Sequence, residues 1–282
     1  MNAPTIMTRL RHSRQGLPPT ASRIAAFIEQ HPHDVIRMSI TELAEQTGAS
    51  EGSVVGLCRR VGASGFQDLK IQLAGQIVEP IQFIQEDLTE RDDFAKVRDR
   101  VFAAHANSLN DTRVLLTPES LTLAVDFLRR ADRVEVYGVG SSAPVAEDLA
   151  YRLLQLGKNC KPVTDSHVQA VSASMTGPDV AIVTVSHSGS TSATVYSTRL
   201  AHEAGAKIIG ITRLGKTPLA RYCDTVLNTV ANETRYRPEA MSSRMAQLGI
   251  IDALVSCYAL SNAAKSIEKL QLSAHVLSEK RF

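Results

Sequence analysis

The sequence predicts an all-α N-terminal domain followed by an α/β domain with a doubly wound, mostly parallel five-stranded sheet. From Thr20 to Gly75 the apolar residues recur three and four positions apart, which is typical of helices. After Thr117-Pro118, short apolar runs alternate with helical patterns, as in folds whose parallel strands are joined by helices. The chain has 282 residues, 44% of them hydrophobic, which is enough for two such cores.

The overall charge and the cysteines narrow the class of protein. The net charge is only +2, so a nucleic-acid partner would require a local basic surface. No apolar run reaches the roughly 18 residues that a membrane span needs, and the basic N-terminus lacks the apolar segment of a signal peptide. Four cysteines lie far apart in apolar stretches, which indicates reduced, buried thiols, no metal site and a cytoplasmic protein.

The N-terminal domain is expected to span residues 1–79. The basic cluster between Arg9 and Arg14 is expected to form an arm ahead of the first helix. Four helices are then predicted: over 20–31, from the capping box Ser39-Ile40-Thr41-Glu42 to Gly48, from the cap Ser50 to Gly62, and over 66–77.

The second and third of these helices have the spacing of a helix-turn-helix. Ala44 is small where the helices meet, Gly48 tolerates the turn, and the apolar residues Ala49, Val54 and Leu57 face back. The third helix then presents to the major groove, or to its phosphates, the residues Ser50, Glu51, Ser53, Val55, Gly56, Arg59 and Arg60. A three-helix protein-interaction or dimerisation module is the alternative, because residues 1–78 hold only eight basic against six acidic side chains.

The rest of the chain is expected to form a charged helical connector over 80–117 and a sheet domain over 118–282. A long final helix is predicted over 241–269. Five strands are predicted, over 133–138, 159–164, 179–185, 207–212 and 223–230.

Two loops rich in glycine and serine follow the first and third predicted strands. Glycine lets a backbone approach a ligand closely, and the helix N-terminus after each loop favours an anion. Both loops are expected at the carboxyl edge of the sheet, where open α/β folds bind ligands. They predict a phosphosugar pocket formed by Gly140, Ser141, Ser142, Ser186, His187, Ser188, Gly189, Ser190 and Thr191. The alternative is that Ser142, Ser188 or Ser190 only caps a helix.

Two nucleotide-binding motifs compete with this interpretation. Gly138-x-Gly140-x-x-Ala143 with Asp165 at the end of the next strand fits a dinucleotide site, although that site has no use for the second loop. Residues 210–217 match the P-loop pattern in full, but Pro218 removes a backbone donor directly after it.

Several motifs together resemble one known family. The run Ser186-His187-Ser188-Gly189-Ser190-Thr191 resembles the S-x-S-G-x-T signature of the sugar isomerase (SIS) domain, a flavodoxin-like fold. Further matches are Gly205-Ala206-Lys207-Ile208-Ile209-Gly210-Ile211-Thr212 and Ser243-Arg244-Met245-Ala246-Gln247-Leu248-x-x-x-Asp252. Met38-Ser39-Ile40-x-x-Leu43-Ala44 and Cys58-Arg59-Arg60-Val61-Gly62-x-x-Gly65-Phe66-x-x-Leu69-Lys70 look like the RpiR-type helix-turn-helix.

The combination is similar to the RpiR family of bacterial transcriptional regulators over nearly the whole chain. The resemblance implies a cytoplasmic homodimer or homotetramer that binds operator DNA, senses a phosphorylated sugar or sugar acid, needs no cofactor and controls carbohydrate metabolism. Two departures stand out. Val55-Gly56 occupies the middle of the recognition helix, where relatives commonly carry a larger polar residue. Isomerase loops usually read S-x-S-G-E-T, and Ser190 replaces that glutamate.

An aldose–ketose isomerase that uses the same pocket is the alternative function. Moving a proton between sugar carbons needs a positioned base and acid. His187 in the second loop and Glu147 on the following helix of the first loop are the available groups. The attached helix-turn-helix favours a sensor over an enzyme.

Overall fold

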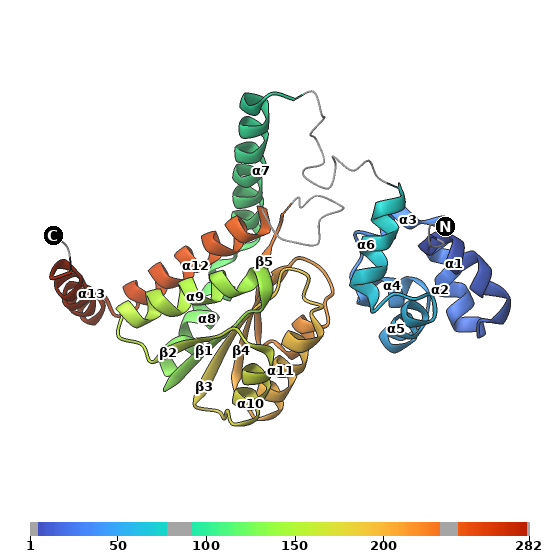
Figure 1. Cartoon of the computed structure of the whole chain (residues 1–282). Helices are drawn as coiled ribbons and strands as arrows, with labels where there is room; N and C mark the ends of the chain where they lie inside the picture. Colours follow the sequence, from blue (N-terminus) through green and yellow to red (C-terminus); the bar gives the residue numbers. More distant parts are fainter. Residues whose placement is uncertain (1–4, 78–91, 232–241, 281–282) are drawn as a thin grey trace. The chain divides into compact units, whose positions relative to one another are not determined.

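The computed structural model describes residues 5–77, 92–231 and 242–280 (Figure 1). The chain divides into two units between Ala103 and Ala104, and helix α7 (Phe94–Leu115) carries the backbone across this boundary. The connector predicted over 80–117 is therefore helical from Phe94 to Leu115, while 80–91 lie outside the described residues.

The first unit is helical, as predicted. Its elements are α1 (Ile6–Ser13), η1 (Arg14–Gly16), α2 (Pro19–Gln30), α3 (Pro32–Val35), α4 (Ile40–Gln46), α5 (Glu51–Arg60) and α6 (Phe66–Ile77). The apolar faces of these helices meet in one core, in which Leu10, Ile28, Leu57 and Leu69 are buried. The capping box at Ser39 opens α4, the Ser50 hydroxyl accepts the N–H of Ser53 at the start of α5, and α6 has the predicted bounds.

The expectation of a basic arm is wrong. Residues 6–13 form α1, because Ile6 and Leu10, one turn apart, are both fully buried in the core. Arg9 is held against the domain, where its guanidinium donates to the carbonyl of Gly62 at 3.4 Å and to Gln72. The spacing of Ile6 and Leu10 was the signal for this helix.

The second unit is built on one sheet, with β1 (Arg133–Tyr137), β2 (Cys160–Val163), β3 (Val180–Val185), β4 (Lys207–Arg213) and β5 (Thr225–Thr229). All five predicted strands are confirmed. Every pair is parallel, and the strand order is β2-β1-β3-β4-β5. This is the flavodoxin-like order of doubly wound sheets.

Helices cover both faces of the sheet (Figure 1). One face packs against α8 (Pro118–Arg130), α9 (Ala143–Gln155) and α12 (Ser242–Leu260), and the other against α10 (Ser166–Ser174) and α11 (Ser192–Glu203). Successive side chains of β3 point to opposite faces of the sheet. Val183 and Val185 pack in the core under α8, α9 and α12, and Ile182 packs in the core under α10 and α11.

The predicted single final helix is also wrong. The chain forms α12 and then α13 (Ala263–Ser278), with a break at Ser261-Asn262, where Asn262 has φ −149° and ψ 69°. The Ser261 hydroxyl donates to the carbonyl of Tyr258 at 2.7 Å. Serine and asparagine compete in this way with the helical hydrogen bonds, and here the apolar periodicity on both sides hides the break.

The four cysteines are unpaired thiols. Cys58 is buried, as predicted, and burial raises its pKa to about 12. Cys160, Cys223 and Cys257 are only partly buried, so the prediction of buried thiols holds for Cys58 alone. Within the described ranges, no helix combines the length and the apolar character that a membrane crossing requires.

A buried carboxylate fastens β1 to its neighbours. Glu135 is fully buried, pairs with Arg133 at 3.1 Å and Lys161 of β2 at 3.2 Å, and accepts hydrogen bonds from Tyr137 and from Ser172 of α10. Burial and then the adjacent carboxylate raise the pKa of the Tyr137 phenol, which stays a donor. This network joins β1, β2 and α10 beneath the first glycine-rich loop.

Glu135→Ala is expected to lower the free energy of unfolding by about 2–4 kcal/mol, because it leaves two cations and two hydroxyls without their shared acceptor. Tyr137→Phe removes only one hydrogen bond and should cost about 1 kcal/mol. Urea denaturation of both variants measures the difference. Equal destabilisation by the two substitutions would show that the carboxylate is not the centre of the network.

Candidate functional site

The two glycine- and serine-rich loops meet at the carboxyl edge of the sheet. They follow β1 and β3, which are adjacent and paired in register, Tyr137 opposite Thr184. The sheet extends from β1 to β2 on one side and from β3 to β4 and β5 on the other. Helix α9, which follows β1, packs on one face of the sheet, and α11, which follows β3, packs on the opposite face. Such a topological switch point opens a crevice at the ends of the strands, where doubly wound proteins bind ligands.

The first loop needs both of its glycines. A Cβ on Gly138 would lie 2.6 Å from the carbonyl oxygen of Ser142, and Gly140 has φ +57° in the left-handed region. The loop ends in a short 3-10 helix over Gly140–Ser142. Within it Ser141 is exposed and Ser142 is buried, so the two hydroxyls lie at different depths.

The second loop is tied to β4 and to the segment that follows it. Gly189 has φ +59°, and a Cβ there would lie 2.6 Å from Thr217 and 2.7 Å from the Thr212 hydroxyl. The carbonyl of His187 accepts the N–H of Arg213 at 3.1 Å, and the carbonyl of Gly189 accepts the N–H of Leu219 at 3.0 Å. The loop is therefore preformed.

Helix capping does not account for the serines. Ser142 and Thr191 are the N-cap residues of α9 and α11, and in the described structure neither side chain makes a capping hydrogen bond. Ser188 and Ser190 bond locally instead, with the Ser190 N–H donating to the Ser188 hydroxyl at 3.2 Å. Both helix N-termini at the crevice thus lack side-chain caps, which leaves their backbone N–H groups available to an anion.

Asp165, the acidic residue of the dinucleotide-binding pattern, caps a helix. The Asp165 carboxylate caps α10 by accepting the N–H groups of His167 and Val168, each at 2.9 Å. These bonds, that of Val168 first, hold the pKa of Asp165 below its usual value. Capping α10 engages Oδ1 of Asp165, so this carboxylate has a structural role that the dinucleotide pattern does not call for.

The P-loop alternative is wrong. Strand β4 continues to Arg213, inside the matched pattern, and the next element is the four-residue 3-10 helix η4 (Leu219–Tyr222) rather than an α-helix. Thr217 is buried, and its hydroxyl accepts the N–H of Ala220. A P-loop holds phosphates at the N-terminus of an α-helix, and the described residues after β4 do not begin such a helix here.

The helix-turn-helix geometry predicted for α4 and α5 is present. Gly48 makes the turn with φ +58°, Ala44 is buried where the helices meet, and Val54 and Leu57 face the core. Arg23 of α2 clamps the turn by donating to the carbonyls of Thr47 at 3.2 Å and Gly48 at 3.1 Å. The sequence did not point to Arg23, since this contact joins residues far apart in the chain.

The residues predicted to face DNA differ in accessibility. Ser50, Gly56, Arg59 and Arg60 are exposed, and three others, Ser53, Val55 and Glu51, are partly exposed. The Glu51 carboxylate accepts the Thr41 hydroxyl at 2.5 Å, which ties the start of α5 to α4. Glu51 therefore has a structural partner that the sequence pattern did not reveal.

Comparisons with known proteins agree with both halves of this architecture. A family model described as the SIS domain matches residues 127–257, and one described as the helix-turn-helix domain of the rpiR family matches residues 5–80. An uncharacterized HTH-type transcriptional regulator of Caldanaerobacter subterraneus is 31% identical over 278 residues, 98% of either chain. Another from Thermotoga maritima is 32% identical over 279 residues, 98% of this chain and 99% of that protein.

A solved structure extends the similarity to the whole fold. The NanR protein of Vibrio vulnificus complexed with ManNAc-6P has a TM-score of 0.82 and 28% identity, covering 98% of this chain and 99% of that one. Because these relatives match over nearly the whole length of both chains, the similarity spans the helix-turn-helix and the sheet domain of this chain. This chain belongs to the RpiR family of transcriptional regulators, with an N-terminal helix-turn-helix and a C-terminal SIS domain.

Proposed function

We propose that this regulator acts in the bacterial cytoplasm on genes of carbohydrate metabolism, and that a phosphorylated sugar or sugar acid is its effector. The observation that carries the proposal is the pair of preformed loops at the β1/β3 switch point, each followed by a helix N-terminus without a side-chain cap. Such a crevice suits a phosphate ester.

The phosphate is proposed to lie at the N-terminus of α11, against Ser186, His187, Ser188, Gly189, Ser190 and Thr191. The sugar is proposed to face Gly140, Ser141 and Ser142 of the first loop. NanR of Vibrio vulnificus was solved with ManNAc-6P, and its similarity over the whole chain makes that compound the first to test.

The DNA contacts are proposed to come from α5. Arg59 and Arg60 are exposed in its last turn and suit phosphate contacts, while Ser50, Glu51, Ser53, Val55 and Gly56 form the side turned toward bases. Gly56 offers no side chain for base readout. Affinity should therefore depend more on phosphate contacts than on base contacts.

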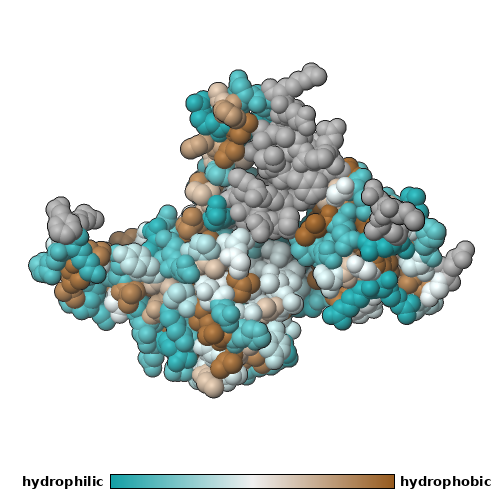
Figure 2. Space-filling view, in the orientation of Figure 1, coloured by the Kyte–Doolittle hydropathy of each residue, from teal (hydrophilic) through white to brown (hydrophobic). Residues whose placement is uncertain are grey.

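A homodimer or homotetramer is proposed, because α13 packs against its own domain with polar residues and leaves apolar residues exposed. Ser266 is buried, and the Lys269 stem lies over Gly157, 3.0 Å from where a Cβ would stand. Apolar residues at three- and four-residue spacing face outward instead, at Ile267, Leu270, Ala274 and Leu277. Figure 2 shows hydrophobic colour on the surface of this C-terminal helix. An outward apolar stripe is typical of a helix covered by another chain.

The connector over 80–117 is proposed to transmit the effector signal between the domains at 1–79 and 118–282. The C-terminal half of α7 is locked to the sheet domain, since the Thr112 hydroxyl accepts the N–H of Val230 at 3.0 Å and donates to its carbonyl at 3.1 Å. Leu109 lies 2.8 Å from where a Cβ on Gly249 of α12 would stand. Movement of α12 or β5 would therefore move α7, and with it the spacing of two DNA-binding domains.

The protein is proposed to be a sensor rather than an enzyme. Ser190 stands where isomerase loops usually carry a glutamate, and its hydroxyl donates to the carbonyl of Ser188. An aldose–ketose isomerase remains the second candidate, because His187 lies in the loop and Glu147 is exposed on α9. Incubation with the same phosphosugars separates the two, since an enzyme releases the isomer and a sensor returns the compound unchanged.

The effector site is tested by a thermal-shift panel of phosphosugars and sugar acids, beginning with ManNAc-6P, followed by binding to a selected operator. Ser141→Ala combined with Ser186→Ala is expected to abolish the response of DNA binding to the effector while leaving DNA binding itself intact. The matched control is Ser174→Ala with Ser278→Ala, two exposed serines away from the loops. A full effector response in the loop variant would place the site elsewhere.

Replacing Arg59 and Arg60 by glutamine is expected to weaken binding to all DNA sequences alike. Each lost phosphate contact should lower the slope of log affinity against log salt concentration by about 1. Titrations at several salt concentrations measure the slope, with Arg98→Gln combined with Arg113→Gln on α7 as a charge-matched control. A loss of affinity confined to the operator, with an unchanged slope, would mean that these arginines read bases.

Leu270→Lys is expected to shift the protein toward monomer, because it places a charge in the middle of the outward stripe on α13. Sedimentation velocity measures the change, and Met175→Lys, at a more exposed apolar position directly after α10, is the control. An unchanged assembly in Leu270→Lys would remove α13 from the interface.

A further inference from the structure

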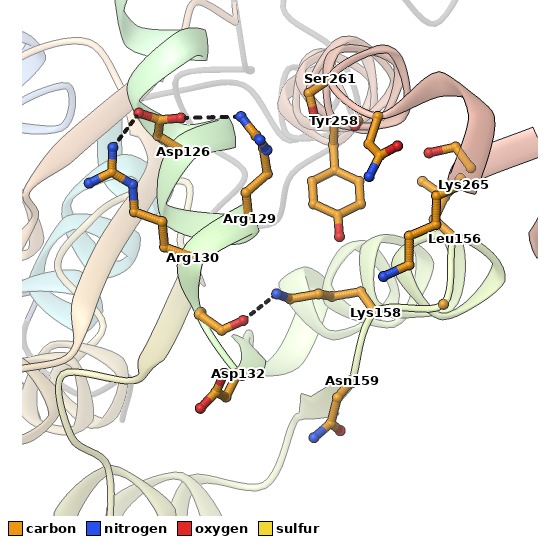
Figure 3. Close-up of a pocket in the computed structure, with 14 residues that line it drawn as sticks. Asp126, Arg129, Arg130, Asp132, Leu156, Lys158, Asn159, Tyr258, Ser261 and Lys265 are labelled. Carbon is orange, nitrogen blue, oxygen red and sulfur yellow. Dashed lines mark hydrogen bonds and ion pairs between the residues drawn. The ribbon is translucent and has the colours of Figure 1, made fainter.

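The opposite edge of the sheet carries a second hollow. A pocket of about 610 Å³ lies where α8 ends, where α9 turns into β2, and where α12 meets α13 (Figure 3). Both the α8–β1 and the α9–β2 connections lie at the amino ends of the strands, so this pocket and the effector loops occupy opposite edges. Its volume is in the range of small-molecule sites.

The pocket wall carries more positive than negative charge. Arg129, Arg130, Lys158 and Lys265 line it together with only two carboxylates, Asp126 and Asp132. Asp126 pairs with Arg130 at 3.1 Å and more loosely with Arg129 at 3.8 Å. The two lysines do not pair with Asp126, so the lining residues carry an excess of positive charge.

Two lysines and a phenol border one space in the pocket. In Figure 3 the hydroxyl of Tyr258 and the nitrogen of Lys265 face this space, and the side chain of Lys158 runs along its edge. Lys158 also donates to the carbonyl of Ala131, which fixes its position. Burial lowers the pKa of Lys158, Asp132 raises it, and Lys265 adds a further lowering. A bound anion would relieve that cost by supplying the missing negative charge.

The start of α13 faces the same pocket. Asn262, its N-cap residue, lines the pocket, and in the described structure its side chain makes no capping hydrogen bond. Lys265 and Ser266, in the first turn, line the pocket as well. A 16-residue helix adds partial positive charge and backbone donors at this end. The break at Ser261-Asn262 thus places the start of α13 at the same pocket as Lys158.

We infer that this amino-edge pocket binds a small phosphate-bearing metabolite, separately from the effector loops. Arg129 offers a planar fork, the lysines offer point charges, and Tyr258 and Ser266 offer hydroxyls. A second ligand here would hold α13 against α9 and β2. Binding at this edge does not require that the carboxyl-edge loops bind a phosphosugar.

Calorimetric titration of the full chain with pyrophosphate tests the site. In the Ser141→Ala/Ser186→Ala variant, saturable binding should persist. Adding Arg129→Gln and Lys265→Gln should weaken it about tenfold or more, because two charge-assisted contacts are lost. Arg113→Gln with Lys280→Gln, which removes one arginine and one lysine outside the pocket, is the charge-matched control. No saturable binding, or unchanged binding after the pocket substitutions, would overturn the inference.

A second measurement uses the unsubstituted protein, so it does not depend on how the variants fold. Pyrophosphate should slow acetylation of Lys158 and Lys265 by a water-soluble acylating reagent, while Lys280 reacts at its usual rate. Peptide mass spectrometry gives the three rates. Equal rates at both pocket lysines with and without pyrophosphate would contradict the proposed site.

Discussion

The pairing of β1 with β3 is the constraint on which the site depends. Because these strands are parallel neighbours and their helices leave toward opposite faces, two loops end at one crevice. Gly138, Gly140 and Gly189 then allow the backbone to turn where a Cβ would collide or be strained. The helix N-termini lack side-chain caps at that place, so the fold itself supplies the donors for an anion.

Much of this arrangement could be predicted from the sequence, since it depends on local patterns. Apolar runs followed by glycine and serine define the strands and loops, and Gly48 with Ala44 defines the helix-turn-helix. Contacts between distant residues could not be predicted: Arg23 clamps the turn, Thr41 engages Glu51, and Glu135 lies buried in an apolar strand. The break at Asn262 was hidden because apolar periodicity continues on both sides of it.

The second unit has features at three places that bear on regulation. The loops proposed to bind the effector lie at the carboxyl edge, Thr112 and Leu109 fix α7 to Val230 after β5 and to α12, and α13 turns apolar residues outward. The amino-edge pocket adds a basic surface at the root of α13. Because the same sheet carries all of these, we propose that a ligand at either edge biases assembly and the position of α7 without a change of fold.

The central claim is that effector binding and DNA binding are coupled. Thermodynamic linkage requires the effect to be reciprocal: if the effector changes operator affinity by some factor, the operator must change effector affinity by the same factor. Calorimetric titration of the identified phosphosugar into the protein alone, and into its complex with a selected operator duplex, measures this directly. The account predicts two different affinities whose ratio equals the effect of the sugar on DNA binding. The same effector affinity in both titrations would contradict it.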